Sequence, residues 1–487
     1  MREILSLVGR MAHDSGIMSS NAQASLETLI YLRVRLADPV YRRVTINTLP
    51  DDALVEIFSF YVDQTDRDDS WYALVHVCRK WRYVVFASPR RLRLRLLCTP
   101  DQPVEKMLHI WPALPIVLVP HRKQLRKQGV NNIIHALKHH DRVYRIDLWV
   151  TNPLLKKMAA TKEPFPALTY LELRSGRATT QILPDSFLGG SAPRLRFVFF
   201  YGIAYPGLRK LLSSTRDIVH LRLHDIPYSG YISPEATATC LSALTRIEEV
   251  SLHFRSPRYD IATQGRSQLQ HTPFVLPALR DFFFTGDSDY LERIITPINA
   301  PVLTRLYIKF FNHLVFGTPS LRRLIGRTEA SRAFCRVDVS FSKGFARLGL
   351  WVDDFPSFEL GISSRMLDWQ LSSVAQLCSS SLPPMPALEC LKIFQDRQHL
   401  QDDIEDIQWL ELLHPFTRFA SVKDLVLSGP LVQHVARALQ KVSGERLIEV
   451  LPMPQPISQR VGRLQPEEHI QEPFRSWSLP DSSLVFP

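Results

Sequence analysis

Residues 46–58, INTLPDDALVEIF, contain the strongest fold signal in the chain. Pro50 stands near the first helical position, and Asp51 and Asp52 follow in the first turn, where the helix dipole favours negative charge. The stretch therefore predicts a helix that begins at about Pro50. Seven of the twelve residues from Pro50 to Tyr61 are apolar, which is more than one face of a helix can bury.

Two further short helices are predicted after an acidic connector at residues 63–69. Ser70 can cap the segment WYALVHV, and the segment RKWRYVVF stops before Ser88-Pro89. Three helices this short bury too little surface to fold alone, so we expect the rest of the chain or a partner to cover them. The apolar residues of the second and third segments are spaced i, i+3, i+4 and i+7: Leu74, Val77, Cys78 and Trp81.

Together these residues resemble an F-box: Leu49-Pro50-Asp51-Asp52-x-Leu54-x-x-Ile57-Phe58, then Leu74-x-x-Val77-Cys78-x-x-Trp81-Arg82. The resemblance implies an all-α three-helix module over residues 46–97 that binds a Skp-type adaptor, and through it a cullin-RING ubiquitin ligase. The acidic connector is longer than in the family's pattern. A buried helical hairpin inside the protein is the alternative. The adaptor-facing residues implied by the resemblance are Leu49, Pro50, Leu54, Ile57, Phe58, Val77, Cys78 and Trp81.

A second pattern recurs from about residue 98 onward, with apolar residues at positions 0, +3 and +5 and a proline two residues before the first. The distances between copies are near multiples of about 27 residues, a period typical of leucine-rich repeats. We therefore expect residues 98–452 to form a degenerate leucine-rich-repeat-like domain, an irregular α/β solenoid. The copies are WPALPIVLV at 111–119, FPALTYLEL at 165–173, APRLRFVFF at 192–200, LPALRDFFF at 276–284, APVLTRLYI at 300–308 and MPALECLKI at 385–393.

Other segments depart from this period. Residues 334–352 alternate, turn at Ser342-Lys343-Gly344 and alternate again, which predicts an antiparallel hairpin. A helix is expected over about 365–379. We also expect an N-terminal helical segment within 1–45 and a poorly ordered tail over 453–487, where the composition turns to PMPQPISQR and similar sequence. The segment ELLHPFTRFASVKDLVLSG at 411–429 resembles the C-terminal part of fungal F-box proteins with such repeats.

Outward side chains between the repeat anchors are candidates for target binding, because parallel strands present them in rows. The aromatic ones are Phe197, Phe199, Phe283 and Tyr307. Exposed aromatic rows are typical anchors of protein interfaces. The alternative is a second covered face, with helices or the 334–352 hairpin packed over these rings.

Composition argues against several other classes. The net charge of +11 is spread in short basic segments, such as HRKQLRK at 121–127, so we expect solvated faces and no nucleic-acid partner. The six cysteines contain no Cys-x-x-Cys pair, which argues against a disulfide framework or a zinc module. No apolar run is long enough to cross a bilayer, and no secretory leader is evident. We expect an intracellular protein of the cytoplasm or nucleus, without a membrane contact.

Catalytic motifs are missing from the sequence: it has no Gly-x-Ser-x-Gly, no phosphate-binding loop and no His-Glu-x-x-His. His135 and His139 lie one helical turn apart without a third ligand, so we expect surface histidines and no metal. Cys78 lies on an apolar stripe, where packing or adaptor contact is expected rather than thiol chemistry. We expect no enzyme activity and no cofactor.

Three functions are compatible with these features. The first, which we expect, is an F-box substrate receptor that holds a protein target near a borrowed ubiquitin-transfer site. The second is an F-box protein that binds the adaptor without ubiquitylating anything. The third is a repeat scaffold unrelated to ubiquitin, which would ignore the adaptor and bind RNA with strong salt dependence.

Overall fold

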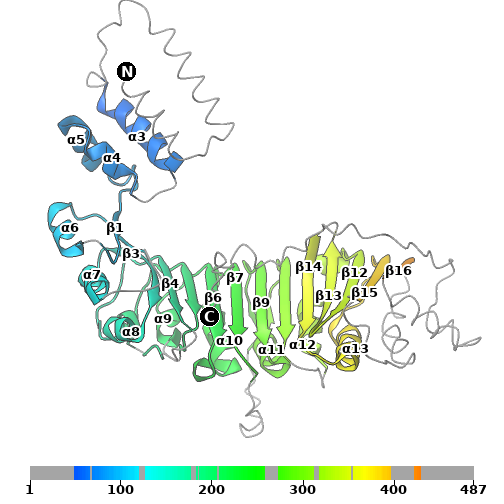
Figure 1. Cartoon of the computed structure of the whole chain (residues 1–487). Helices are drawn as coiled ribbons and strands as arrows, with labels where there is room; N and C mark the ends of the chain where they lie inside the picture. Colours follow the sequence, from blue (N-terminus) through cyan, green and yellow to red (C-terminus); the bar gives the residue numbers. More distant parts are fainter. Residues whose placement is uncertain are drawn as a thin grey trace, which may run out of the picture. The chain divides into compact units, whose positions relative to one another are not determined.

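The structure is a computed structural model, and its described residues fall into two compact units, Met1–Leu171 and Glu172–Pro487 (Figure 1). The expected N-terminal helical segment, the C-terminal tail, the basic segment at 121–126 and most of the segment at 411–429 lie outside the described residues. The structure describes residues 49–65, 69–101, 103–119, 127–176, 182–184, 186–205, 208–257, 272–311, 317–352, 355–395 and 422–428.

The three predicted N-terminal helices are present in the first unit. They are α3 (Asp51–Thr65), α4 (Trp71–Val75) and α5 (Arg79–Ala87). Helix α3 begins immediately after Pro50, as its sequence predicts. Ser70 precedes α4, but its hydroxyl makes no capping hydrogen bond, so the predicted side-chain cap is wrong. Helix α4 ends at Val75 and α5 begins at Arg79, so Val77 and Cys78 of the predicted apolar stripe lie between the two helices.

Aromatic packing joins these helices to the following segment of the same unit. The Trp71 indole Nε1–H donates a hydrogen bond to the Arg95 carbonyl at 2.9 Å. Its ring stands edge-on to Trp111 with centroids 5.4 Å apart, and Phe86 lies at 6.0 Å. Trp71 is 1% exposed, so it is a core residue of this unit.

The rest of the first unit alternates short strands and helices. Strands β1, β2 and β3 pair in parallel. Strand β4 (Tyr170–Ser175) contains the boundary between the two units. The elements are β1 (Leu96–Cys98), α6 (Val104–Ile110), β2 (Ile116–Leu118), α7 (Lys127–Leu137), β3 (Val143–Val150) and α8 (Asn152–Ala159).

The second unit contains a large, mostly parallel sheet. Its strand order from β5 onward is β5-β6-β7-β9-β11-β14-β13-β12-β15-β16, and every pair in it is parallel except β14–β13 and β13–β12. The strands are β5 (Phe197–Tyr201), β6 (His220–Ile226), β7 (Glu249–Phe254), β9 (Asp281–Gly286), β11 (Arg305–Phe310), β12 (Arg336–Ser342), β13 (Phe345–Val352), β14 (Phe355–Ile362), β15 (Cys390–Gln395) and β16 (Asp424–Ser428), with a separate parallel pair of β8 (Phe274–Val275) and β10 (Ile298–Asn299).

Each of the six proline-marked phrases contains a strand, namely β2, β4, β5, β9, β11 and β15. The apolar anchors are buried, as in Leu279, Phe282 and Phe284 of the fourth copy, except for Val119 of the first copy, which is half-buried. These strand predictions are confirmed, and so is a parallel-rich α/β sheet. A solenoid of leucine-rich repeats stays a prediction.

The predicted hairpin is confirmed and is larger than expected. Strands β12 and β13 pair antiparallel from Arg336 opposite Trp351 to Ser342 opposite Phe345, and Gly344 in the turn has a φ of 86° that favours glycine. The sequence did not reveal β14, which pairs antiparallel with β13 and parallel with β11. These three strands enter the sheet side by side, so the hairpin does not pack over the sheet face.

Helices of the second unit pack against one another in chain order, α9–α10–α11–α12 and then η6, and Figure 1 shows α10 to α13 along one side of the strands. The helix expected at 365–379 is present as α13, followed by the π-helical turn η6. The elements are η3 (Phe187–Gly190), α9 (Leu208–Ser213), η4 (Tyr228–Gly230), α10 (Pro234–Ser242), α11 (Ser288–Ile295), α12 (Pro319–Gly326), η5 (Glu329–Arg332), α13 (Leu367–Gln376) and η6 (Leu377–Ser381).

Candidate functional site: two protein-interaction surfaces

The eight predicted adaptor-facing residues divide into a core group and a surface group. Leu54, Phe58 and Trp81 are buried, and the rings of Phe58 and Trp81 lie 4.6 Å apart. These three residues hold α3 against α5. Pro50, Ile57 and Val77 are exposed, whereas Leu49 and Cys78 are half-buried.

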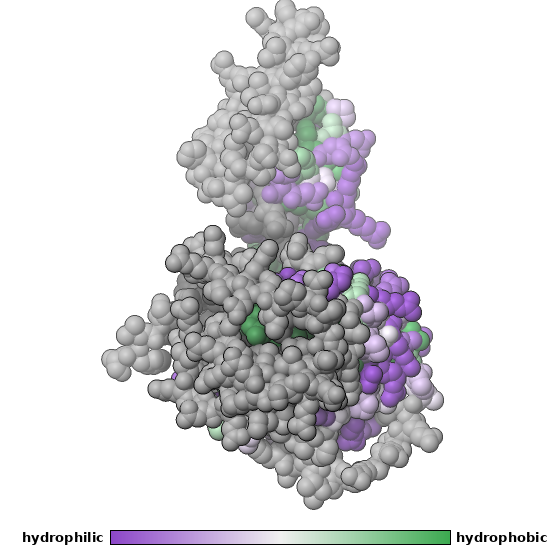
Figure 2. Space-filling model, turned by 90° about the vertical axis from the view of Figure 1, so that its right-hand side faces the viewer, coloured by the Kyte–Doolittle hydropathy of each residue, from purple (hydrophilic) through white to green (hydrophobic). Residues whose placement is uncertain are grey.

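The exposed members of the predicted adaptor-facing set include large apolar side chains that are accessible to solvent. Ile57 and Val77 are 46% and 48% exposed, and Phe60, one turn after Ile57 on α3, is 53% exposed. Figure 2 shows this mixture at the level of α3 to α5, where green hydrophobic atoms border purple hydrophilic ones. Neighbouring exposed apolar residues on a helix are typical of a protein interface.

Phe60 and Tyr83 were missed as site residues. Tyr83 on α5 is 69% exposed and borders a shallow depression of about 420 Å³, together with Arg79, Arg82 and Phe86. Phe60 could have been predicted from the sequence, because it is one of the apolar residues of the first helix that a single buried face cannot accommodate. Tyr83 gave no signal, since a single tyrosine in a short basic helix is common on any surface.

The second surface is one face of the sheet in the second unit. Residues alternate along a strand, so the side chains between the buried anchors point to the other face. On β5, β6, β7 and β9 the residues Phe199, Arg222, Ser251 and Phe283 stand opposite one another, and Tyr307 continues this row on β11. The predicted target-binding residues Phe199, Phe283 and Tyr307 thus share one row, while Phe197 lies one step earlier, opposite His220.

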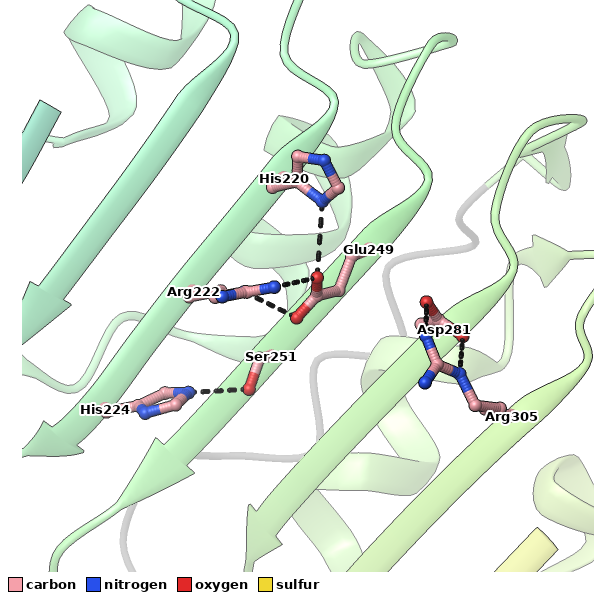
Figure 3. Close-up of polar contacts among 7 residues, drawn as sticks. All are labelled: His220, Arg222, His224, Glu249, Ser251, Asp281 and Arg305. Carbon is pink, nitrogen blue, oxygen red and sulfur yellow. Dashed lines mark hydrogen bonds and ion pairs between the residues drawn. The ribbon is translucent and has the colours of Figure 1, made fainter. Parts of the chain in front are cut away.

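Ion pairs run between neighbouring strands across this face (Figure 3). Arg222 donates Nε–H and Nη2–H to the two carboxylate oxygens of Glu249 at 2.6 and 2.5 Å. Burial raises the pKa of Glu249, but the hydrogen bonds from His220 and Arg222 outweigh it and hold the pKa at about 2. The carboxylate is therefore ionised and neutralises Arg222.

A matching pair lies between β9 and β11. Arg305 donates to both oxygens of Asp281, each at 2.5 Å, and the Arg305 side chain is 65% exposed. Both pairs have the bidentate geometry in which a guanidinium and a carboxylate fit best.

The predicted rings on β5 lie next to arginine side chains. The Arg222 guanidinium lies 5.5 Å from the centroid of Phe197, and that of Arg174 lies 5.7 Å from the centroid of Phe199. Both distances are within the range of a cation–π interaction, and both rings are half-buried.

Two histidines complete the face. The rings of His224 and His253 are stacked 4.4 Å apart, and His224 Nε2 lies 2.8 Å from the Ser251 hydroxyl. Burial lowers the pKa of His224 to about 4, with a smaller contribution from Arg222, and burial likewise lowers that of His253. Both rings are therefore neutral at pH 7.

The described residues were compared with the requirements of a metal site and of a membrane-spanning helix. Within it, no three His, Cys, Asp or Glu side chains are grouped as a metal site would require. His135 and His139 lie on or next to the end of α7, both half-buried. Among the same residues, no helix has the length and hydrophobicity to span a bilayer.

Comparison with known families assigns the segment that carries the first surface. Residues 46–95 match the F-box-like family, so this part of the chain is an F-box-like domain. F-box domains bind Skp1-type adaptors of cullin-RING ligases, which supports a general role as a substrate receptor. No curated protein matches the chain. The fungal origin and the leucine-rich repeats remain predictions.

Proposed function

We propose that this chain is the substrate receptor of a Skp–cullin–F-box type ubiquitin ligase, and that it bridges a protein target to the adaptor without chemistry of its own. The observation that carries the proposal is the F-box-like domain at residues 46–95 with its exposed apolar side chains. A receptor of this kind gains rate by raising the effective concentration of the target at the transfer site.

The adaptor-binding surface consists of Leu49, Pro50, Ile57, Phe60 and Val77 in this proposal. Burying one aliphatic anchor contributes roughly 1.5 to 3 kcal/mol. The core residues contribute indirectly, because they fix the angle between α3 and α5: Leu54, Phe58 and Trp81. Cys78 immediately precedes the first turn of α5.

The target-binding surface is the sheet face that carries Phe197, Phe199, Phe283 and Tyr307. In this proposal residues 98–452 act as one solenoid-like repeat body. The reason is that each repeat can bury the apolar side chains of its strand only against the adjacent repeats. A receptor needs, besides its adaptor surface, a target-binding surface far larger than a small-molecule pocket. The row of half-buried aromatic rings with ion pairs between them has the composition of a protein interface.

Co-purification with the adaptor tests the proposal directly. The full chain should retain the adaptor at both low and high salt, because an apolar interface is only weakly screened. Replacing both Leu49 and Pro50 by alanine should weaken the complex on the order of a hundredfold. Absence of adaptor together with salt-sensitive RNA binding would instead identify the repeat scaffold.

Target turnover separates a ligase receptor from an adaptor-binding protein without a ligase role. Proximity labelling with the full chain, compared with a chain lacking residues 46–97, should identify proteins labelled by both. If the chain is a ligase receptor, those proteins should accumulate in cells that express only the truncated form. Unchanged half-lives would support the second function.

A further inference from the structure

We infer that the target segment bound by the sheet face is uncharged, with aromatic or aliphatic side chains, and is recognised without phosphorylation. This inference rests on the proposed function and names its substrate class. It follows from the way in which the arginines of this face are used.

The arginines on the sheet face are already neutralised. Arg222 and Arg305 each hold a carboxylate through two hydrogen bonds, to Glu249 and Asp281. At the ends of the neighbouring strands β6 and β7, Arg255 holds Asp225 in the same bidentate way, at 3.0 and 2.8 Å. Arg347 of β13 lies 3.0 Å from Glu359 of β14.

A phosphate that bound the fork of Arg222 or Arg305 would have to displace the carboxylate already held there. Phosphate recognition uses the planar fork of a guanidinium, and in the three bidentate pairs that fork is occupied. The displaced carboxylate would remain beside the phosphate and repel it. The half-buried pair makes this displacement costly, since the Arg222 and Glu249 side chains are 15% and 10% exposed.

On the helix side of the second unit the pairing of arginines is less uniform: Arg293 of α11 pairs with Glu235 of α10, whereas other arginines stay unpaired within the described residues. On α12 and η5 the arginines Arg322, Arg323, Arg327 and Arg332 are all exposed, and none of them forms an ion pair within the part of the chain that the structure describes. A chain with a net charge of +11 has no general surplus of carboxylates. The arginines beside the rows of aromatic side chains are therefore paired, whereas the described residues of the helix side include both paired and unpaired arginines.

The other groups beside Arg222 and Arg305 are aromatic or small polar side chains, except for the charged Lys309 on β11. Phe283 and Tyr307 stand opposite each other on β9 and β11, next to the small side chain Ser251. Lys309 lies 5.0 Å from the centroid of the Phe345 ring rather than against a carboxylate. Neutralised ion pairs around aromatic rings match a partner that buries apolar side chains.

A peptide array provides the test, with the full chain bound to its adaptor as the probe. The array carries short aromatic and aliphatic peptides that contain one serine or tyrosine, each in unmodified and phosphorylated form. We expect unmodified peptides to bind, their phosphorylated copies to bind at least about tenfold more weakly, and affinity to change little with salt. Phe283→Ser and Tyr307→Ser should reduce binding, whereas Arg327→Gln on the helix side should not.

A gain of function sharpens the test. Glu249→Gln and Asp281→Asn together release Arg222 and Arg305, so this variant should bind the phosphorylated peptides better than the native chain does. The matched control, Glu329→Gln on η5, should change nothing. A native preference for phosphorylated peptides, or the absence of any peptide binding, would overturn the inference. Binding of the adaptor is measured separately, by its co-elution with the chain. Loss of the adaptor would contradict the proposed function, whereas the peptide measurements test this inference.

Discussion

The rings of Phe58 on α3 and Trp81 on α5 lie 4.6 Å apart with their planes tilted by 56°. Both residues belong to the sequence motif, and both are buried. The motif therefore supplies both a small aromatic core and exposed apolar side chains, such as Ile57 and Val77, in one short segment.

Replacing Phe58 by alanine should destabilise the F-box-like domain by about 3 to 5 kcal/mol, because the change removes a buried ring from a core with few other members. Hydrogen exchange of the α3 and α5 amides in the full chain should speed up by about two orders of magnitude or more. Phe60→Ala is the control, since this ring is 53% exposed, and it should leave protection unchanged. Equal effects of the two variants would show that the division between core and surface is wrong.

Arg222→Gln should be far more damaging than Arg305→Gln. The first leaves Glu249 charged in a half-buried site and should cost about 3 kcal/mol, whereas the Arg305 side chain is 65% exposed and its pair should contribute less than about 1 kcal/mol. Urea unfolding followed by tryptophan fluorescence measures both. Similar midpoints for the two variants would contradict this ranking.

Gly361→Ala should destabilise the part of the sheet formed by β12, β13 and β14. A Cβ at this position would lie 2.3 Å from the Phe345 ring, so the ring and Lys309 above it would have to move. Overpacking of this kind typically costs about 1 to 3 kcal/mol. Gly176→Ala is the matched control, because nothing lies within 4 Å of the added carbon. We expect a lower melting temperature for the first variant alone, measured by calorimetry.

Stability should fall as the pH is lowered through the range set by His224. Its pKa is about 4 in the folded chain and 6.5 when unperturbed. Between these values the unfolded chain takes up a proton that the folded chain does not, so acid favours unfolding by at most about 1.4 kcal/mol per pH unit. His224→Gln removes this contribution, and its stability curve should be flatter from pH 6.5 to 4. Parallel curves for the variant and the native chain would contradict the buried, neutral ring.

Local patterns predicted much of the fold. Proline followed by apolar residues at fixed spacing located six strands, because proline sets the entry to the strand and alternation buries one face. Strand β14 was missed, since its sequence FPSFELGI contains a proline and a glycine and alternates poorly. Its place is fixed by antiparallel pairing with the adjacent β13 and by parallel pairing with β11, and the second of these contacts is distant in sequence, so no local pattern encodes it.

The candidate sites were predictable only in part. Motif spacing identified Ile57 and Val77, but it could not separate them from Phe58 and Trp81, since exposure depends on how three helices pack. Aromatic residues on the sheet face were identified from alternation. Their carboxylate-paired arginines were not, because Arg222 and Glu249 are brought together by strand register across 27 positions of sequence.

The central claim is that the F-box-like domain binds a Skp-type adaptor through the exposed apolar residues of its helices. Calorimetric titration of the adaptor into the full chain, with and without Ile57→Asp and Val77→Asp, tests it most directly. Gln64→Ala, an exposed polar position on α3, serves as the control. We expect tight binding by the native chain and the control, and at least about a hundredfold loss in the double variant with unchanged melting temperature. Undiminished affinity of the double variant, or no binding by the native chain, would contradict the claim.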